Sequence, residues 1–139
     1  MKRLRKILLV DDDRITNLMH TRLIDRTGLA EEVEIETDGQ AALEHLEHAQ
    51  ANGGVLPDLI LLDINMPRMD GFEFLEAYAA LPAQMTEGRK ILMLSTSTLD
   101  DDRRRAEADP NVTGFMAKPL STERLLSFLR APGSAGQAG

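Results

Sequence analysis

Short runs of apolar residues recur along the chain, and two of them end directly in aspartate. These runs are Ile7–Val10 and Leu59–Leu62. Continuous apolar runs of this length are typical of parallel strands whose two faces are both covered. Shorter or alternating patterns predict three more strands, at Glu32–Glu36, Lys90–Leu94 and Thr113–Ala117. The pattern therefore predicts five strands.

Between these strands the apolar residues recur at the spacing of amphipathic helices. The first predicted helix can be capped by Asp13 and closes at Gly28. Its apolar positions are Ile15, Leu18, Met19 and Leu23. The same spacing and capping signals predict four further helices, over Ala41–Ala49, Phe72–Ala79 and Leu99–Ala108 and after the capping residue Ser121. The polar segment Ala83–Arg89 is predicted to be a loop.

The alternation of strands and helices predicts the fold. Connections are of normal length and there is no internal repeat, which favours an α/β fold with a doubly wound parallel sheet and helices on both faces. With 139 residues, of which 42% are apolar, the chain can form one complete core but not two. We expect one domain over residues 1–131 and a disordered tail of small residues over 132–139.

Composition and charge exclude several classes of function. The formal net charge of -7 leaves no overall basic field that would attract nucleic acid. The chain has no cysteine, so disulfides, thiolate metal sites and a cysteine nucleophile are all excluded. The apolar run near the amino terminus is too short for a signal sequence or a membrane span. We therefore expect a cytoplasmic protein that binds neither nucleic acid nor membrane.

Chemically capable side chains follow four of the predicted strands. Parallel strands bring their carboxyl ends to one edge of the sheet, so these groups should meet there; they are Asp11, Asp12, Asp63, Ser95 and Lys118. Three crowded carboxylates repel one another unless a cation is present, and hard oxygen ligands suit Mg²⁺, with Mn²⁺ as a second possibility. Beside such a cation, one carboxylate can act as a nucleophile toward a phosphoryl group. The combination predicts phosphorylation of an aspartate.

Four motifs follow one another along nearly the whole chain, between Lys6 and Arg130: LLVDDD, LLDINMPRMDG, MLSTS and GFMAKP. In order and spacing they resemble the receiver domain of two-component response regulators, and in particular the single-domain chemotaxis receivers. The resemblance implies a flavodoxin-like sheet of five parallel strands in the order 2-1-3-4-5. Any one of the motifs would be weak evidence, whereas the four together are highly specific.

The resemblance also implies a role for each residue of the site. Asp63 is the implied phosphoacceptor and a metal ligand, and Asp12 binds the metal directly. Asp11 acts nearby through water, and the backbone carbonyl of Asn65 completes the coordination. Lys118 is the implied cation that contacts the phosphoryl oxygens.

Further implied roles concern the conformational switch. Ser95 is the implied switch hydroxyl, and Phe115 is the switch aromatic, here without the hydroxyl that a tyrosine would carry. Ser97 lies where the family tunes loss of the phosphoryl group, and Pro119 should follow a cis peptide bond.

The implied function is that of a stand-alone response regulator, which is a signalling domain and not an enzyme acting on other molecules. It would accept its phosphoryl group from a histidine kinase or a phosphotransfer protein. Its output would be a protein contact through the face formed by the fourth helix, the fifth strand and the fifth helix, as a monomer or a phosphorylation-dependent dimer. First-helix surface residues would govern kinase choice: Arg14, Asn17 and Thr21. The start MKRLRK and the tail favour a complete single-domain product over a piece of a hybrid kinase.

Two other functions use some of the same residues. A phosphohydrolase of the haloacid dehalogenase type also has an aspartate nucleophile, but it carries a second aspartate two residues later, where this chain has Asn65. An interaction module that works without phosphorylation would not need the complete set of acids, hydroxyl and lysine. Both alternatives are therefore disfavoured.

Several polar residues have plainer interpretations. Asp13 is predicted to be a helix cap in preference to a third metal ligand. His45 and His48 are predicted to lie on a solvated helix face, since no further ligand accompanies them. The run Arg103–Arg105 is predicted to be a solvated helix end, and His20 has no catalytic partners in the sequence.

Overall fold

Five strands form one sheet in the computed structural model, which describes residues 3–96 and 100–130. All four strand pairs are parallel, and the order is β2-β1-β3-β4-β5. The predicted flavodoxin-like α/β fold is therefore confirmed. The strands are β1 Leu4–Val10, β2 Ala30–Glu36, β3 Leu59–Asp63, β4 Lys90–Ser95 and β5 Gly114–Ala117.

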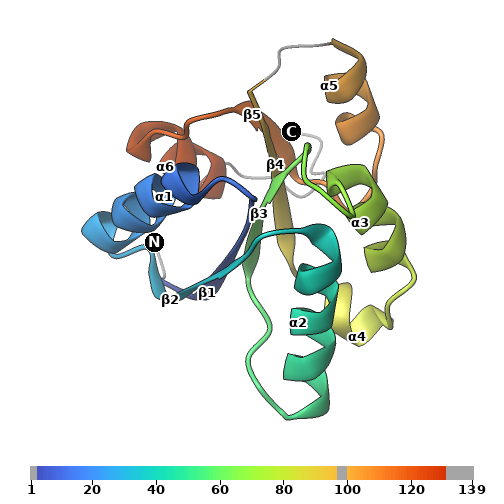
Figure 1. Cartoon of the computed structure of the whole chain (residues 1–139). Coiled ribbons are helices and arrows are strands. Elements are labelled where there is room, and N and C mark those ends of the chain that lie inside the picture. The colour runs from blue at the N-terminus through green and yellow to red at the C-terminus, as the bar shows by residue number, and fades with distance from the viewer. Residues whose placement is uncertain (1–2, 97–99, 131–139) are drawn as a thin grey trace.

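Helices cover both faces of this sheet (Figure 1). One face carries α1 Arg14–Thr27 and α6 Thr122–Arg130, and the other carries α2 Gly39–Ala51, α3 Gly71–Ala79, α4 Ala83–Thr86 and α5 Asp100–Glu107. Successive strand residues point to opposite faces, so the apolar runs of β1 and β3 supply both cores at once. Ile7 and Leu9 join the core beneath α1 and α6, whereas Leu8 and Val10 join the core beneath α2 and α3.

Aspartates begin three of the helices. The side chains of Asp13, Asp38 and Asp70 accept backbone N–H groups from Thr16, Ala41 and Glu73, at the starts of α1, α2 and α3. Each carboxylate satisfies an N–H group that would otherwise lack a partner in the first turn. The predicted cap at Asp13 is confirmed, and so is Ser121, whose hydroxyl accepts the Arg124 N–H at 3.1 Å.

Two expectations about the helices are wrong. The segment predicted as a loop over Ala83–Arg89 contains the single-turn helix α4, which a buried Met85 anchors to the core.

In α1, Leu23 is buried as the spacing suggests, but the other three apolar positions are exposed: Ile15, Leu18 and Met19. The buried stripe of α1 instead includes the polar residues Asn17 and His20. The Nδ2 of Asn17 and the Nε2 of His20 are each hydrogen-bonded to a backbone group, which offsets part of the cost of burying these side chains. The Oδ1 of Asn17 is buried and accepts no hydrogen bond from the described residues.

The solvated-face prediction is right for His48 and wrong for His45. His48 is exposed, but the ring nitrogens of His45 lie 2.6 Å from a carboxylate oxygen of Glu34 and 2.8 Å from one of Glu36. Both glutamates are on β2, so His45 joins α2 to the edge strand.

Some expectations fall on residues outside the described part of the chain. These are Ser97, Leu99 and the tail from Pro132. Within the described residues, no helix combines the length and apolar character needed to cross a membrane.

Candidate functional site

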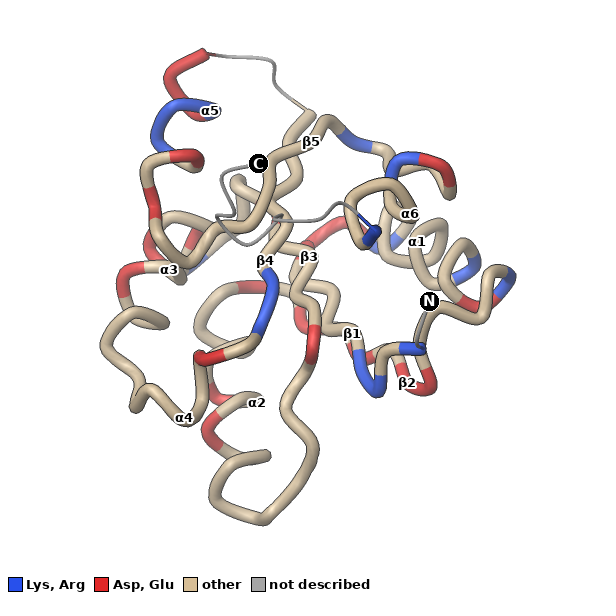
Figure 2. The backbone as a smooth tube through the Cα atoms, turned by 180° about the vertical axis from the view of Figure 1, so that it is seen from behind, with Lys and Arg blue, Asp and Glu red and all other residues tan. Residues whose placement is uncertain are grey.

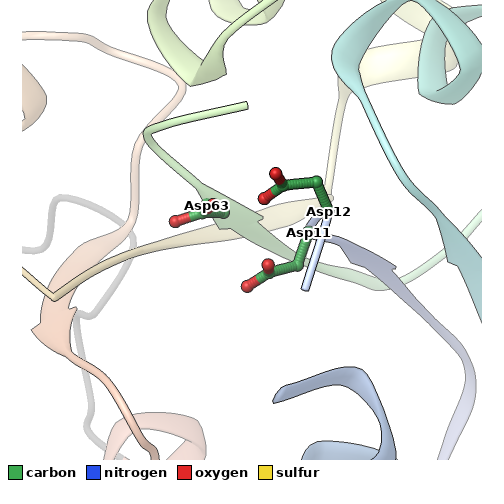
Figure 3. Close-up of side chains that lie close together, drawn as sticks. All are labelled: Asp11, Asp12 and Asp63. Carbon is green, nitrogen blue, oxygen red and sulfur yellow. The ribbon is translucent and has the colours of Figure 1, made fainter. Parts of the chain in front are cut away.

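The predicted site residues lie at the carboxyl edge of the sheet. Asp11 and Asp12 follow β1, while Asp63 is the last residue of β3. One carboxylate oxygen from each of these three residues lies within 4.8 Å of one from each of the others. Figure 3 shows the three side chains close together at the ends of their strands. Among the described residues they are the only group of three or more such side chains close enough to share a metal ion. The strand registry of β1 with β3 brings them together, since Val10 pairs with Leu62.

Lys118 supplies the positive charge of this cluster. Its Nζ donates to Asp11 Oδ2 at 2.9 Å and lies 3.1 Å from Asp63 Oδ1. All three side chains are less than a tenth exposed, so water screens their interactions poorly. The residue that follows β5 therefore contacts the acids that follow β1 and end β3, as the sequence predicts.

The acidic surroundings shift the protonation equilibria of the site. Burial, together with the negative charge of Asp11, raises the pKa of Asp63 to about 6 in spite of Lys118. Burial alone would lower the pKa of Lys118, but its hydrogen bond to Asp11 and the charge of Asp63 outweigh burial and raise it. The lysine is thus held in its charged form, whereas Asp63 is held back from ionising.

The donor set fits a hard divalent cation. Two buried carboxylates, from Asp11 and Asp63, and one exposed carboxylate, from Asp12, converge on one point. Their repulsion is only partly offset by Lys118, because three formal negative charges face one positive charge. Oxygen ligands and excess negative charge are what Mg²⁺ and Mn²⁺ require. Asn65 lies two residues after Asp63, at an exposed position in the loop between β3 and α3.

Asn17 holds Asp11 in place and differs from its prediction as a surface residue of the first helix. It is 4% exposed, and its Nδ2 donates to the backbone oxygen of Asp11 at 2.8 Å. The Asp11 carboxylate also accepts the N–H of Asp13 at 2.9 Å. Asp13 itself is engaged as the α1 cap, and hydrogen bonds from Thr16 lower its pKa. Asn17 is therefore a supporting residue of the site.

Ser95 and Phe115 lie on the neighbouring strands. Ser95 ends β4 and is fully buried, and its backbone oxygen accepts the Lys118 N–H at 2.9 Å. Phe115, on β5, is half-buried, and the guanidinium of Arg103 lies 4.9 Å from its ring centroid. The Lys118–Pro119 peptide bond is cis, as expected.

The sequence matches the family described as the response regulator receiver domain over residues 7–130. The chain belongs to this family. Receiver domains are signalling domains, which argues against the alternative of a haloacid dehalogenase-type phosphatase. The expected resemblance is therefore confirmed, and the acidic cluster lies in a receiver.

Individual relatives agree with the family assignment. The receiver is 34% identical over 140 residues to the probable methanogenesis regulatory protein FilR2 of Methanothrix harundinacea, in a match that covers 93% of this chain and 88% of that protein. It spans about half or less of several other curated relatives.

Solved structures give the same result. A two-component response regulator from Cytophaga hutchinsonii is 32% identical, with a TM-score of 0.85 and coverage of 92% of this chain and 96% of that one. The chemotaxis response regulator CheY4 of Vibrio cholerae is 34% identical, with a TM-score of 0.71 and coverage of 91% and 97%.

Gly71 lets the α3 helix of the receiver begin directly against the site. A Cβ atom there would lie 2.5 Å from the backbone oxygen of Asp63 and 3.0 Å from the Cα of Ile64. Neither backbone atom can rotate away, so Gly71→Ala is expected to lower the free energy of unfolding by about 2 kcal/mol. Urea denaturation of the metal-free protein measures this loss. Gly54→Ala is the control, because its Cβ would come no closer than 3.4 Å to any atom; equal stability losses in the two variants would contradict the prediction.

Proposed function

We propose that this receiver accepts a phosphoryl group on Asp63 from a histidine kinase or a phosphotransfer protein, and then signals through a protein contact. The observation that supports the proposal most strongly is the buried Asp63 carboxylate, which shares its surroundings with two further acids and with the ammonium of Lys118. That combination offers one nucleophile, ligands for a divalent cation and a cation for the transferred oxygens.

In the proposed transfer, a carboxylate oxygen of Asp63 forms a bond to the phosphorus of a phosphohistidine. The phosphorus–nitrogen bond breaks, and the leaving imidazole nitrogen keeps the electron pair. Asp63 must be ionised to attack, so its raised pKa of about 6 means that a cation close by would favour the reactive form. Asp12, Asp63 and the Asn65 carbonyl, with Asp11 through water, would hold the ion. Bound Mg²⁺ or Mn²⁺ would neutralise the charge on the carboxylates and phosphoryl oxygens.

The proposed output is a change in the face formed by α5, β5 and α6. Phosphorylation replaces the Asp63 carboxylate with a more highly charged group. The Nζ of Lys118 already lies 3.1 Å from Asp63 Oδ1, close to where that group would form. Ser95 and Phe115, on adjacent strands, would respond, and the resulting shift in population would be recognised by a downstream protein. Ala106 is the only buried residue of α5 among those described. The three arginines Arg103–Arg105 lie in the middle of this helix, between acidic residues at both ends (Figure 2). A helix held by so little apolar contact is suited to move.

The proposed docking surface for the phosphodonor is α1. Arg14 is exposed there, as expected, but Asn17 is not available. Instead, Ile15 and Leu18 line an open groove of about 810 Å³ between α1 and the β2 residue Ile35. These exposed apolar side chains extend the predicted kinase-choosing surface.

The receiver is proposed to work in the cytoplasm, as a monomer or as a dimer formed on phosphorylation.

A small phosphodonor tests the central proposal. Wild-type protein incubated with phosphoramidate and Mg²⁺ is expected to gain the mass of one phosphoryl group, measured on the intact protein. The same incubation with excess chelator should give little or no gain, because the repulsion among the three acids is then not neutralised. An absence of gain with Mg²⁺ would contradict the proposal, and rapid multiple turnover of a chromogenic phosphate ester would favour the phosphatase alternative.

A further inference from the structure

Arg68 has a backbone conformation that is unusual for a residue with a side chain. Its φ angle is 64°, and it is the only non-glycine residue with positive φ in the described part of the chain. The left-handed region brings Cβ close to the following carbonyl oxygen and is disfavoured for every residue except glycine. Arg68 lies in the loop between β3 and α3, five residues after Asp63. Some interaction must therefore compensate for an arginine at this position.

The Arg68 side chain reaches across to the turn that starts α2. Its Nε donates to Asp38 Oδ2 at 3.0 Å, and its Nη2 contacts the same oxygen. The Asp38 carboxylate is 3% exposed, and its other oxygen accepts the Ala41 N–H at 2.8 Å. Burial would raise the pKa of Asp38, but the hydrogen bonds from Arg68 and the α2 backbone lower it. Arg68 therefore neutralises a buried charge that would be costly to leave unpaired.

A second contact joins the same two segments beside this ion pair. The Gly39 N–H donates to the backbone oxygen of Met69 at 3.1 Å. A Cβ atom on Gly39 would lie 2.9 Å from that oxygen, so the two backbones approach as closely as glycine permits. At its far end the loop is closed by the Gly71 N–H, which donates to the Ile64 oxygen at 2.8 Å. The loop that contains Asn65 is thus attached to the β2–α2 turn at both Arg68 and Met69.

We propose that Arg68 is a positioning residue: its ion pair with Asp38 ties the β3–α3 loop to the β2–α2 turn and so holds the segment after Asp63 in place for phosphoryl transfer. The inference rests on the proposed function for its last step. A glycine would adopt the observed backbone freely but could not reach Asp38. An arginine here has an unfavourable backbone conformation but makes a contact that glycine cannot make. That contact joins the loop that is proposed to supply the Asn65 carbonyl to Asp38 in the β2–α2 turn.

Three variants separate the side-chain contact from the backbone conformation. Arg68→Gly removes the contact and relieves the disfavoured φ angle, and Arg68→Ala removes the contact but keeps the disfavoured conformation. Asp38→Asn removes the charge while asparagine still caps α2, because Asn and Asp are comparable caps. Arg104→Ala is the matched control, since Arg104 is 72% exposed against 68% for Arg68 and is also paired with an aspartate, Asp101.

Hydrogen exchange of the metal-free protein is the first measurement. The amides of Gly39 and Gly71 are expected to exchange about tenfold faster in Arg68→Gly, Arg68→Ala and Asp38→Asn, while the β1 amides Ile7–Val10 keep their wild-type rates. Arg68→Lys should restore part of the protection, because it returns the charge without the planar donor group. A general loss of stability would instead speed exchange throughout the sheet.

Phosphoryl uptake is the second measurement. At subsaturating Mg²⁺ the initial rate with phosphoramidate should fall about fivefold in the three variants, and the Arg68→Ala/Asp38→Asn double variant should be no slower than the slower single variant. Wild-type exchange and uptake in Arg68→Gly would overturn the proposal, because the side chain would then be dispensable. If wild-type protein takes up no phosphoryl group, the proposed function fails, and the exchange rates alone decide whether the attachment exists.

Discussion

Asp63→Asn is expected to abolish phosphoryl uptake completely. The substitution preserves the size of the side chain but replaces the carboxylate oxygen nucleophile with an amide, which cannot form the acyl phosphate. Asp11 and Asp12 remain in place, so loss of uptake would not reflect loss of the whole acidic cluster. Intact mass spectrometry after incubation with phosphoramidate and Mg²⁺ measures the result at conditions that saturate the wild type.

Asp58→Asn is the control for this variant. Asp58 immediately precedes β3, at the opposite end of the strand from Asp63, and its carboxylate accepts the Arg5 N–H at 2.7 Å. Its variant should gain a phosphoryl group to the wild-type extent. An equal gain in Asp63→Asn would place the phosphoacceptor elsewhere and defeat the proposal.

Asp63→Asn should also stabilise the metal-free protein near neutral pH. The folded-state pKa of Asp63 is raised from 3.8 to about 6, so the folded state binds this proton more tightly than the unfolded state. The free energy of unfolding therefore falls as pH rises from about 4 to about 6, and the full penalty is present above that range. Asp63→Asn removes the penalty, which we put at about 2 kcal/mol, or about 5 °C in Tm, at pH 7.5.

Thermal unfolding with chelator at several pH values tests whether Asp63→Asn raises the stability of the metal-free protein. The advantage of Asp63→Asn should disappear below about pH 4, where Asp63 is protonated in both states of the wild type. If Asp63→Asn were less stable than the wild type at pH 7.5, burial and the charge of Asp11 would not destabilise the ionised Asp63 carboxylate as we expect.

The strand ends could be predicted from the sequence because parallel topology leaves little freedom. Once Ile7–Val10 and Leu59–Leu62 are assigned as parallel strands, the residues that follow them must share an edge. Asp11 and Asp63 contact one another because β1 and β3 are also neighbours in the sheet, a strand order that the family resemblance implied. Lys118 follows by the same reasoning from β5. The shared edge needed only the order of elements along the chain, whereas the order of strands within the sheet came from the resemblance to receiver domains.

Supporting residues could not be predicted because their partners are backbone atoms. Asn17 and His20 are buried in α1 through contacts with the Asp11 oxygen and the Leu120 N–H, and no pattern of side chains signals such partners. The apolar spacing instead pointed to Ile15 and Leu18, which are exposed. Arg68 is a similar case, since a positive φ angle in an arginine leaves no trace in the sequence.

Lys118→Met is expected to be strongly destabilising in the absence of metal. Methionine fills a similar volume, but the buried carboxylates of Asp11 and Asp63 lose the only cation that contacts them among the described residues. Removing one partner from a buried ion pair typically costs 3–5 kcal/mol, and we expect a loss of about 3 kcal/mol in the free energy of unfolding. Urea denaturation with chelator at pH 7.5 measures it. At pH 5 the loss should be smaller, because Asp63 then becomes protonated.

Added Mg²⁺ separates this loss from an ordinary packing defect. The ammonium of Lys118 and a divalent cation compete for the same carboxylates, so Mg²⁺ should stabilise Lys118→Met more than it stabilises the wild type. Lys6→Met is the matched control: Lys6 is equally buried and contacts Glu34 at 2.8 Å, but it lies near the other end of β1. Its variant should lose stability that Mg²⁺ does not restore. Equal responses of the two variants to Mg²⁺ would mean that Lys118 does not neutralise the cation-binding acids.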